Sequence, residues 1–229
     1  MNERTIKRIR LSCVWAVLIV SVLGLGVSSV RAEASESERW ERLAKVLETS
    51  PTPKTVRGTF EQVRTSLLLS EPITSEGSFI SAGAVSRWSL GKPDSIEVRL
   101  DAESMRIYYA EDNVLEIYPV TEQSIPALNQ RPDLERLASD FRLVGIDIDE
   151  RVVSIELVAK GKMRKHLQAL RLVYDANKGV LRQLVTTDPA GDTTRMTLTN
   201  IVIDEPIEEQ ALDLEVPDDA RVERPADTK

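Results

Sequence analysis

Cysteine and histidine are almost absent from this 229-residue sequence, which contains one of each, Cys13 and His166. A zinc site needs several such ligands, and a Ser-His or Cys-His nucleophile system needs a correctly placed histidine. His166 lies in the basic stretch Arg164-Lys165-His166-Leu167 at a predicted strand entry, where we expect a surface role. No G-x-S-x-G motif or phosphate-binding loop is present. The sequence therefore predicts no metal, no cofactor and no enzyme.

Aromatic residues are also scarce, at 4% of the chain, and the formal net charge is −7. Sugars and exposed bases are usually recognised on aromatic platforms, which this chain has few residues to build. Nucleic acid is excluded as a partner, because the negative field repels a polyanion and no basic patch with interleaved aromatics offsets it. The same field disfavours anionic membrane surfaces.

Carboxylates are plentiful, so a hydrolase that uses two acidic groups is kept as an alternative. Such an enzyme needs two carboxylates facing each other in a cleft, with the pKa of one raised by burial. The acidic pairs lie beside predicted turns or in the acidic C-terminal stretch, where solvated roles are expected; they are Asp147/Asp149, Glu208/Glu209 and Asp218/Asp219.

Residues 1–32 have the pattern of a secretory signal peptide. Four basic residues precede an apolar run from Leu11 to about Val27, and Val30-Arg31-Ala32 offers a cleavage site. The pattern predicts export to the periplasm; an uncleaved membrane anchor is the alternative. Cys13 lies at the start of this run, whereas a lipid-modified cysteine would follow it, which argues against lipidation. Cleavage after Ala32 removes five basic residues and one acidic residue, leaving about 197 residues with a net charge of −11 and no cysteine.

The N-terminus of the exported part is predicted to form one amphipathic helix. Ser35-Glu36-Ser37-Glu38 is a capping-box pattern, and Leu43 and Leu47 follow at helical spacing with Trp40. Pro51 and Pro53 end the helix. Its apolar face must lie against another element.

From Thr55 to Val120 the hydrophobic period changes to two, which predicts a series of short antiparallel strands with one solvated face. The first strand is expected to run from Thr55 to Leu69, with a bulge where the period slips near Glu61-Gln62. Further strands are predicted from Gly77, around Trp88 and Leu90, and over 96–100, 105–109 and 114–118.

A second helix is predicted after Pro132, with Leu134, Leu137 and Phe141 on its apolar face and its end by Gly145. Strands then resume over 151–160, 168–174, 180–187 and 194–203, joined by hairpin-type turns at 175–179 and 188–192. Residues 217–229 are polar and are predicted to form a loose tail.

These patterns predict a mainly β (α+β) fold of nine or ten antiparallel strands in one strongly curved sheet, because an open sheet of that size must curl or close. Two amphipathic helices are too few to cover a large flat sheet, so we expect them to pack against its concave side. The aliphatic residues on the strands form either an ordinary dry core or the wall of a cavity, and periodicity does not distinguish the two; they include Leu67, Leu68, Leu69, Ile80, Leu90, Leu115, Ile117, Met196 and Leu198.

Several short motifs resemble the LolA-type outer-membrane lipoprotein carriers. Gly58-Thr59-Phe60-Glu61-Gln62 is similar to the family's F-x-Q, Glu76-Gly77-Ser78-Phe79 to its G-x-[FL] strand opening, and Arg87-Trp88-Ser89-Leu90-Gly91-Lys92-Pro93 to its aromatic residue before a proline. Met105 to Tyr109 with Leu115 to Tyr118 resembles its next hairpin, and Ala211 to Val222 its closing F-x-x-P-x-x-V strand.

The resemblance implies an unclosed β-barrel whose helices cover a hydrophobic cavity on the concave side, with residues 33–216 as the carrier domain. It implies a monomeric periplasmic carrier that takes acyl chains of a lipoprotein or related lipid from an inner-membrane donor to an outer-membrane acceptor. The cavity and its movable helical lid would be formed by Leu43, Leu47, Phe60, Leu67, Leu69, Phe79, Trp88, Leu90, Val98, Ile107, Leu134, Leu137, Phe141 and Leu198.

One segment departs from the family pattern. Family members have an Arg-Pro pair between the G-x-[FL] strand and the aromatic strand, and that arginine tethers the lid in the empty state. Here the segment is Ser81-Ala82-Gly83-Ala84-Val85, and Arg87 is the nearest possible substitute. The departure is compatible with a different lipid or glycolipid cargo. The alternative function is a non-enzymatic envelope regulatory module that senses a partner protein or a lipid.

Overall fold

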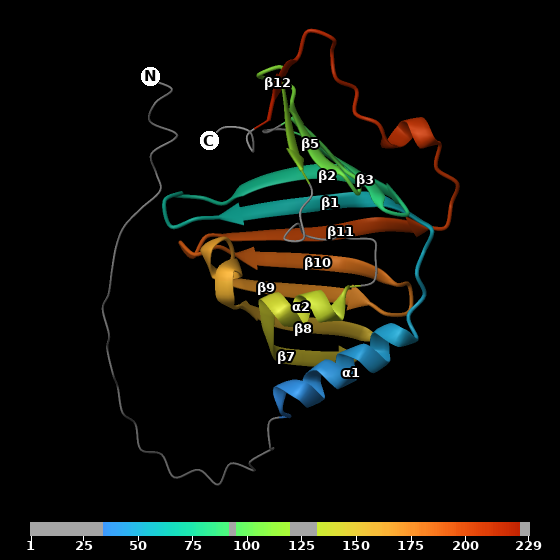
Figure 1. Cartoon of the computed structure of the whole chain (residues 1–229), viewed down its shortest axis with the longest axis vertical. Coiled ribbons are helices and arrows are strands. Elements are labelled where there is room, and N and C mark those ends of the chain that lie inside the picture. Colours follow the sequence, from blue (N-terminus) through green and yellow to red (C-terminus); the bar gives the residue numbers. More distant parts are fainter. Residues whose placement is uncertain (1–33, 92–94, 120–131, 225–229) are drawn as a thin grey trace. The chain divides into compact units, whose positions relative to one another are not determined.

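The computed structural model describes residues 34–91, 95–119 and 132–224 (Figure 1). Residues from Ala34 onward belong to one compact unit. The predicted signal peptide lies outside the described residues, as do Lys92 to Asp94 and the last five residues of the predicted tail. None of the helices within the described ranges has the length and hydrophobicity to cross a membrane.

Twelve strands form a single sheet in which neighbours pair antiparallel, except that β12 pairs parallel with β6. The spatial order is β12-β6-β5-β4-β3-β2-β1-β11-β10-β9-β8-β7, so β12 and β7 are the two edges and the sheet is not closed. The strands are β1 Thr55–Thr65, β2 Ile73–Ala82, β3 Val85–Leu90, β4 Ile96–Leu100, β5 Ser104–Tyr109, β6 Val114–Pro119, β7 Phe141–Asp149, β8 Val152–Ala159, β9 Ala169–Asp175, β10 Val180–Thr187, β11 Thr193–Ile203 and β12 Arg221–Glu223.

The predicted fold class is confirmed: the sheet is open, curved and almost entirely antiparallel, and helices accompany one of its faces (Figure 1). Within the described residues the helices are α1 Glu36–Glu48 and α2 Leu134–Asp140, and the short 3₁₀ turns are η2 Gly161–Lys165 and η3 Glu209–Leu212. One core cluster holds the buried side chains of α1 together with those of β1, β2 and β7 to β11.

Helix α1 begins at the predicted capping box. The Ser35 hydroxyl accepts the Glu38 N–H at 3.3 Å, and the Glu38 carboxylate accepts the Ser35 N–H at 2.6 Å, so two N–H groups that lack helical partners are satisfied. Leu43 and Leu47 are the buried side chains of this helix, with 0% and 1% of their surface exposed. The apolar stripe read from the sequence is therefore the face that enters the core.

An aromatic floor, formed by Phe60, Phe79 and Trp88, covers the centre of the concave face. Phe60 pairs across the strands with Gly77, and Phe79 pairs with Gly58. Each ring lies over the glycine of the neighbouring strand, where a Cβ atom would come within 2.5 Å of Phe60 or 2.9 Å of Phe79. Trp88 stacks on Phe79 with ring centroids 4.9 Å apart and lies 5.5 Å from Phe60. The glycines in the motifs are thus explained by close packing of aromatic rings.

The predicted second helix was too long. Helix α2 ends at Asp140, and Phe141, which we had placed on its apolar face, begins strand β7. In β7 burial alternates between Phe141 and Leu143, which are buried, and Arg142 and Val144, which are exposed. The helical pattern and the strand pattern overlap at this junction, and pairing with β8 decides in favour of the strand. The sequence prediction therefore missed β7.

Two further predictions about the strands were wrong. Strand β1 ends at Thr65 rather than Leu69, and its irregularity lies between Arg57 and Thr59, not at Glu61-Gln62. The predicted loose tail contains β12, whose three residues pair with Val114 to Glu116 of β6. With β7 and β12 added, the sheet has twelve strands instead of nine or ten.

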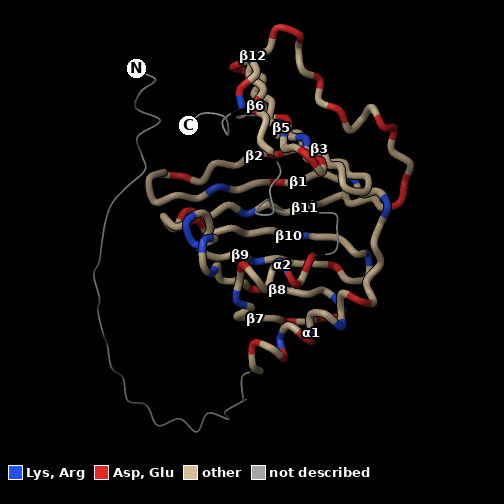
Figure 2. Tube along the Cα trace, viewed as in Figure 1, with Lys and Arg blue, Asp and Glu red and all other residues tan. Residues whose placement is uncertain are grey.

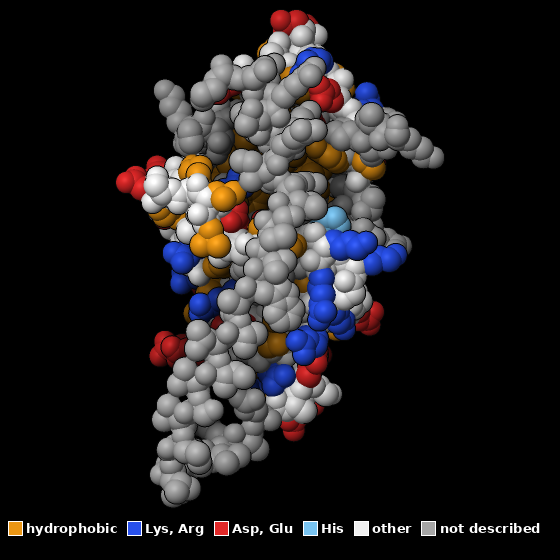
Figure 3. Space-filling view, turned by 90° about the vertical axis from the view of Figure 1, so that its left-hand side faces the viewer, with side chains coloured by type: hydrophobic (Ala, Val, Ile, Leu, Met, Phe, Trp, Pro, Cys, Tyr) orange, Lys and Arg blue, Asp and Glu red, His pale blue; other side chains and the backbone are white. Residues whose placement is uncertain are grey.

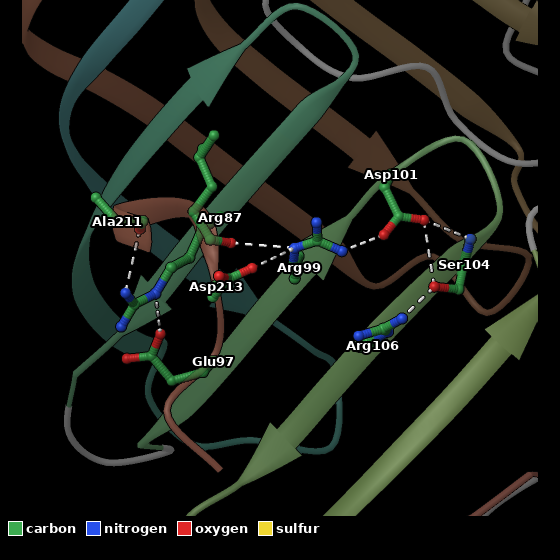
Figure 4. A network of polar contacts seen from close by, with 9 residues as sticks. Arg87, Glu97, Arg99, Asp101, Ser104, Arg106, Ala211 and Asp213 are labelled. Atoms are coloured by element: carbon green, nitrogen blue, oxygen red, sulfur yellow. Dashed lines mark hydrogen bonds and ion pairs between the residues drawn. The ribbon is translucent and has the colours of Figure 1, made fainter. Parts of the chain in front are cut away.

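The convex face of β3 to β5 carries a polar network that holds the C-terminal segment (Figure 4). The Arg87 guanidinium pairs with Glu97 at 2.9 Å and donates to the Ala211 carbonyl, and Arg99 donates to the Leu212 carbonyl at 3.2 Å. Burial by itself would raise the pKa of Asp101, but the N–H groups of Ser104 and Glu103, the Arg99 charge and the Ser104 hydroxyl outweigh it and lower that pKa. Asp101 is therefore held as an anion beside Arg99.

Candidate ligand-binding site

A pocket of about 440 Å³ lies between helix α2 and the connection from β8 to β9. Its volume falls within the ordinary range of small-molecule sites. The wall combines residues of α2, the first residue of β7, the β8–β9 connection and one residue of β9; they are Asp133, Arg136, Leu137, Ser139, Asp140, Phe141, Lys160, Gly161, Lys162, Met163, His166, Leu167 and Leu170.

Local structure explains how α2 frames this pocket. The Asp133 side chain accepts the Arg136 N–H at 3.1 Å and so caps the first turn. At the other end, the Asp140 carbonyl accepts the Lys160 N–H at 2.8 Å, which ties the helix to the β8–β9 connection. No side chain of α2 is fully buried, and Leu134 and Leu137 are half-buried. The helix thus rests over the pocket rather than being embedded in the core.

The wall is aliphatic and aromatic, whereas the rim is polar. Leu137, Phe141, Met163, Leu167 and Leu170 supply the apolar surface. The rim carries three cationic side chains and two carboxylates, namely Arg136, Lys160, Lys162, Asp133 and Asp140. Within residues 34–91, 95–119 and 132–224, no cluster of acidic, histidine and cysteine side chains is arranged to hold a metal. This arrangement suits an apolar ligand with a polar end.

The interior above the aromatic floor is filled in this conformation. A void of only about 10 Å³ remains there, walled by Val56, Phe79, Ser81, Ser86, Trp88, Val180, Leu181 and Leu198. That volume is at the lower limit for a single water molecule. Hollows of about 610 and 840 Å³ on other parts of the sheet are more open to solvent, so the pocket beneath α2 is the more enclosed space for a ligand.

Helix α1 is fixed at both ends, unlike α2. The Arg39 guanidinium donates to the Leu143 carbonyl at 2.9 Å, and the Glu36 carboxylate accepts the Leu143 N–H at 3.3 Å. At the other end, Arg151 donates to the Thr49 carbonyl and hydroxyl and to the Ala176 carbonyl. Helix α1 is therefore a fixed wall of the half-barrel, whereas α2 has no fully buried side chain.

The residues predicted to line a cavity are distributed over three environments. Those in the core are Leu43, Leu47, Phe60, Phe79, Phe141 and Leu198, and those packed against it are Trp88, Leu90, Leu134 and Leu137. Val98 and Ile107 face each other on β4 and β5 and are half-buried. Of all these residues, Leu137 and Phe141 contact the 440 Å³ pocket.

Leu67 and Leu69 do not line the interior, so their assignment to the cavity was wrong. They lie in the β1–β2 connection, with 90% and 39% of their surfaces exposed, and Leu68 between them is 72% exposed. The alternation that suggested a continued strand ends at Thr65, because β2 begins only at Ile73 and pairs with β1 as far as Arg64.

Sequence reasoning missed Met163, Leu167 and Leu170 as pocket residues. Met163 and Leu167 are separated by four positions within a basic stretch, and Leu167 N–H donates to the Met163 carbonyl at 2.9 Å. This backbone turn brings both apolar side chains to the pocket, whose lining also includes Lys160 and Lys162. The spacing was the available cue, and the surrounding charge obscured it.

A second polar feature lies on β5 and β6, on the face shared with Trp88 and Val98. The Tyr118 and Tyr109 hydroxyls both donate to the same Glu116 oxygen, at 2.8 and 3.2 Å. The hydrogen bond to Glu116, followed by burial and the negative charge nearby, raises the pKa of Tyr118 to about 12. Burial, then the Glu116 charge and its hydrogen bond, raises the pKa of Tyr109 as well.

We expect Glu116→Gln to lower the pKa of Tyr118 toward the ordinary tyrosine value near 10. A raised pKa means that folding favours the protonated phenol, so its contribution to stability is complete below about pH 10 and is lost as the pH rises through about 12. Titration of the tyrosinate ultraviolet absorbance measures the shift. Glu111→Gln, in the exposed β5–β6 turn, is the matched control; an unchanged titration in Glu116→Gln contradicts the assignment.

Arg87 does not replace the missing arginine of the Arg-Pro pair. Trp88 and Leu90 face the concave side, so Arg87 faces the convex side, where it contacts Glu97 and the C-terminal segment (Figure 4). The segment from Ser81 to Val85 forms the tight β2–β3 turn, with Gly83 at a φ of +56°. The contacts that tether α2 here are the backbone hydrogen bond from Lys160 to Asp140 and its packing against η2 and β7.

An open, curved antiparallel sheet with a helix resting over an apolar pocket defines an unclosed half-barrel. The chain belongs to the family described as "Outer membrane lipoprotein carrier protein LolA", whose sequence profile matches residues 52–211. The family predicted from the short motifs is thereby confirmed. No curated protein matches the sequence significantly.

Solved structures with a similar fold are distant in sequence. An uncharacterized conserved protein from Thermus thermophilus is 15% identical with a TM-score of 0.48, covering 80% of this chain and 98% of that one. A putative outer membrane lipoprotein-sorting protein domain from Vibrio parahaemolyticus is 11% identical with a TM-score of 0.44, covering 78% and 97%. The Pseudomonas aeruginosa MucA/MucB complex gives 17% identity and a TM-score of 0.42, covering 79% of this chain and 61% of the matched chain.

Proposed function

We propose that this protein is a periplasmic carrier that shelters an acyl chain of a lipoprotein or related lipid beneath α2. The observation that carries the proposal is the 440 Å³ pocket with an apolar wall and a polar rim. Each methylene withdrawn from water contributes about 0.8 kcal/mol, so exposing a long acyl chain costs on the order of 10 kcal/mol. A lipid therefore needs a sheltered route across an aqueous compartment.

The carrier role requires no covalent chemistry of the protein. The family description names an outer membrane lipoprotein carrier. The cargo would be received from an inner-membrane donor and delivered to an outer-membrane acceptor, which is what the resemblance of the motifs to this family implies. Movement of α2 would open the pocket, and it is the helix without a fully buried side chain, whereas α1 buries Leu43 and Leu47. Residues Leu137 and Phe141 contact the cargo from one side, and Met163, Leu167 and Leu170 from the other.

Uptake of a fluorescent fatty acid tests the proposal directly. We expect Leu167→Gln to weaken uptake roughly tenfold, because a buried amide without a partner costs about 1–3 kcal/mol more than an apolar side chain. Leu68→Gln makes the same chemical change at a residue that is 72% exposed and outside the pocket, so its uptake stays at the wild-type level.

Native mass spectrometry of the protein isolated from the bacterial envelope provides a second measurement. Co-purified acylated species support the carrier. A clean ligand-free mass together with no uptake of the fluorescent fatty acid contradicts it. A stable stoichiometric protein partner with a lipid-free pocket supports the regulatory module instead.

A further inference from the structure

Three connections of the sheet lie along one edge of the half-barrel, which we call the loop edge. It consists of the β1–β2 connection (66–72), the β10–β11 turn (188–192) and the β8–β9 connection (160–168). Strand pairing brings them together, since Thr65 pairs with Thr193, Thr193 and Ala169 both pair with Thr187, and Ala169 pairs with Val158. Figure 1 shows these loops on the left of the sheet.

The β1–β2 connection presents three consecutive leucines to solvent. Leu67, Leu68 and Leu69 are 90%, 72% and 39% exposed, and Ile73 at the start of β2 is 38% exposed. Single exposed leucines are common, but a run of three at the tip of a hairpin is an apolar projection that water solvates poorly. The fold does not need these residues, because β1 has already ended at Thr65.

The β8–β9 connection, four strand spacings away, is the basic part of the loop edge. Its cationic residues are Lys160, Lys162, Arg164 and Lys165 (Figure 2). Four spacings of about 4.8 Å place it roughly 19 Å from the leucine tip. Among the described residues no carboxylate forms an ion pair with any of these four side chains, and Arg164 donates to the Ala159 carbonyl.

The loop edge carries fewer other charged residues, and some of these already form hydrogen bonds within their own turns. Glu71 follows the leucine tip, and the β10–β11 turn carries Asp188 and Asp192. Asp188 accepts the N–H groups of Ala190 and Asp192 at 2.8 and 3.0 Å and so stabilises its own turn. Arg64 and Arg195 flank the two turns and are exposed. Figure 3, which faces this side, shows hydrophobic side chains and a group of basic side chains beside the histidine.

We propose that the loop edge docks onto an anionic lipid bilayer, with the leucine tip inserted among the acyl chains and the β8–β9 connection against the headgroups. Interfacial binding combines buried apolar surface with attraction of basic residues to anionic lipids. The inference goes beyond the carrier function, since a carrier can receive its cargo from a protein without touching a membrane.

The net negative charge of the chain predicts repulsion from an anionic membrane. Most of that charge lies too far from the loop edge to act on a bilayer in contact with it. At physiological ionic strength, charges more than about 8 Å apart are largely screened. A bilayer in contact with the loop edge therefore interacts mainly with the local basic cluster rather than with the acidic remainder. Lys160, Lys162, Met163, His166 and Leu167 also line the pocket, so the rim of the pocket, with its three cationic side chains and two carboxylates, lies beside the proposed membrane surface.

The test is a fluorescent label on the leucine tip. The whole chain is used, in a Cys13→Ser background, with an environment-sensitive probe attached at Leu68→Cys. Vesicles of equal parts phosphatidylglycerol and phosphatidylcholine should shift its emission to the blue, and spin-labelled lipids should quench it. The matched control is Lys178→Cys, in the β9–β10 turn at the opposite edge, where neither change is expected. Because the readout is local, it does not depend on whether residues 1–32 are retained.

Two charge variants complete the experiment. Lys162→Glu with Lys165→Glu should weaken vesicle binding by the tip about tenfold or more, whereas Lys54→Glu with Lys178→Glu, away from the loop edge, should leave it unchanged. Neutral phosphatidylcholine vesicles or high salt should reduce the response of the unmodified protein as well. No response of the Leu68→Cys label to anionic vesicles, or an equal response of the Lys178→Cys label, overturns the proposal. Fatty-acid uptake is measured separately, so a carrier that does not dock is recognised as such.

Discussion

Gly77→Ala is expected to destabilise the protein by about 3 kcal/mol or more. A Cβ atom at Gly77 would lie 2.1 Å from the Ser89 carbonyl oxygen on β3 and 2.5 Å from the Phe60 ring. Backbone and a buried ring cannot both withdraw without separating β2 from β3 or lifting Phe60 off Trp88. Overpacking and strain of this kind belong to the short list of mechanisms that produce large effects from a single substitution.

Urea denaturation of Gly77→Ala gives the free energy of unfolding, and near-ultraviolet circular dichroism reports the Phe60–Trp88 contact. The matched control is Gly145→Ala on β7, where the nearest atom is the end of the flexible Glu156 side chain, at 2.9 Å. That side chain can move, so the control should lose no more than about 1 kcal/mol. Equal stability of the two variants would show that the aromatic floor is not tightly packed against Gly77.

Leu43→Ala should cost about 3 kcal/mol, whereas Leu137→Ala should cost less than about 1 kcal/mol. Leu43 is fully buried in the core, and the cavity left by its side chain cannot collapse because α1 is held by Arg39 and Arg151. Leu137 is half-buried on α2 and borders a pocket that already contains space.

The two leucine variants distinguish a fixed helix, α1, from a helix that opens, α2. Denaturant midpoints measure stability, and fatty-acid affinity measures the pocket; we expect Leu137→Ala to change the affinity more than the stability. Leu68→Ala is the control for the substitution itself, with an effect within about 0.5 kcal/mol, because Leu68 is 72% exposed. A large loss of stability in Leu137→Ala would mean that α2 is part of the core and cannot open.

The fold was largely predictable because local patterns and pairing agree over most of the chain. The capping box, the α1 stripe and the alternation in β8 to β11 each indicate a single structure. Strand β7 was missed because Phe141 continues the helical spacing of Leu134 and Leu137, and only pairing with β8 assigns it to a strand. Strand β12 is three residues long and pairs with a distant partner, β6; the resemblance of residues 211–222 to the family's closing strand pointed to it, whereas the polar composition predicted a loose tail.

The candidate site was harder to predict than the fold. Alternation identifies which side chains face the core, but not where packing leaves space. Phe60, Phe79 and Trp88 fill the centre of the concave face by stacking, and the space lies instead beside the β8–β9 connection. That connection was interpreted as a solvated basic loop, since its charges outnumber Met163 and Leu167.

The contacts between α1 and β7 have a consequence for how molecules of this protein behave in a crowded compartment. Edge strands offer unpaired N–H and C=O groups, which another chain can use for strand addition and fibre growth. Arg39 and Glu36 already occupy the Leu143 carbonyl and N–H near the start of the β7 edge. Without these contacts the free edge of β7 could pair with a strand of another molecule. Helix α1 therefore reduces the tendency of the protein to self-associate through this edge.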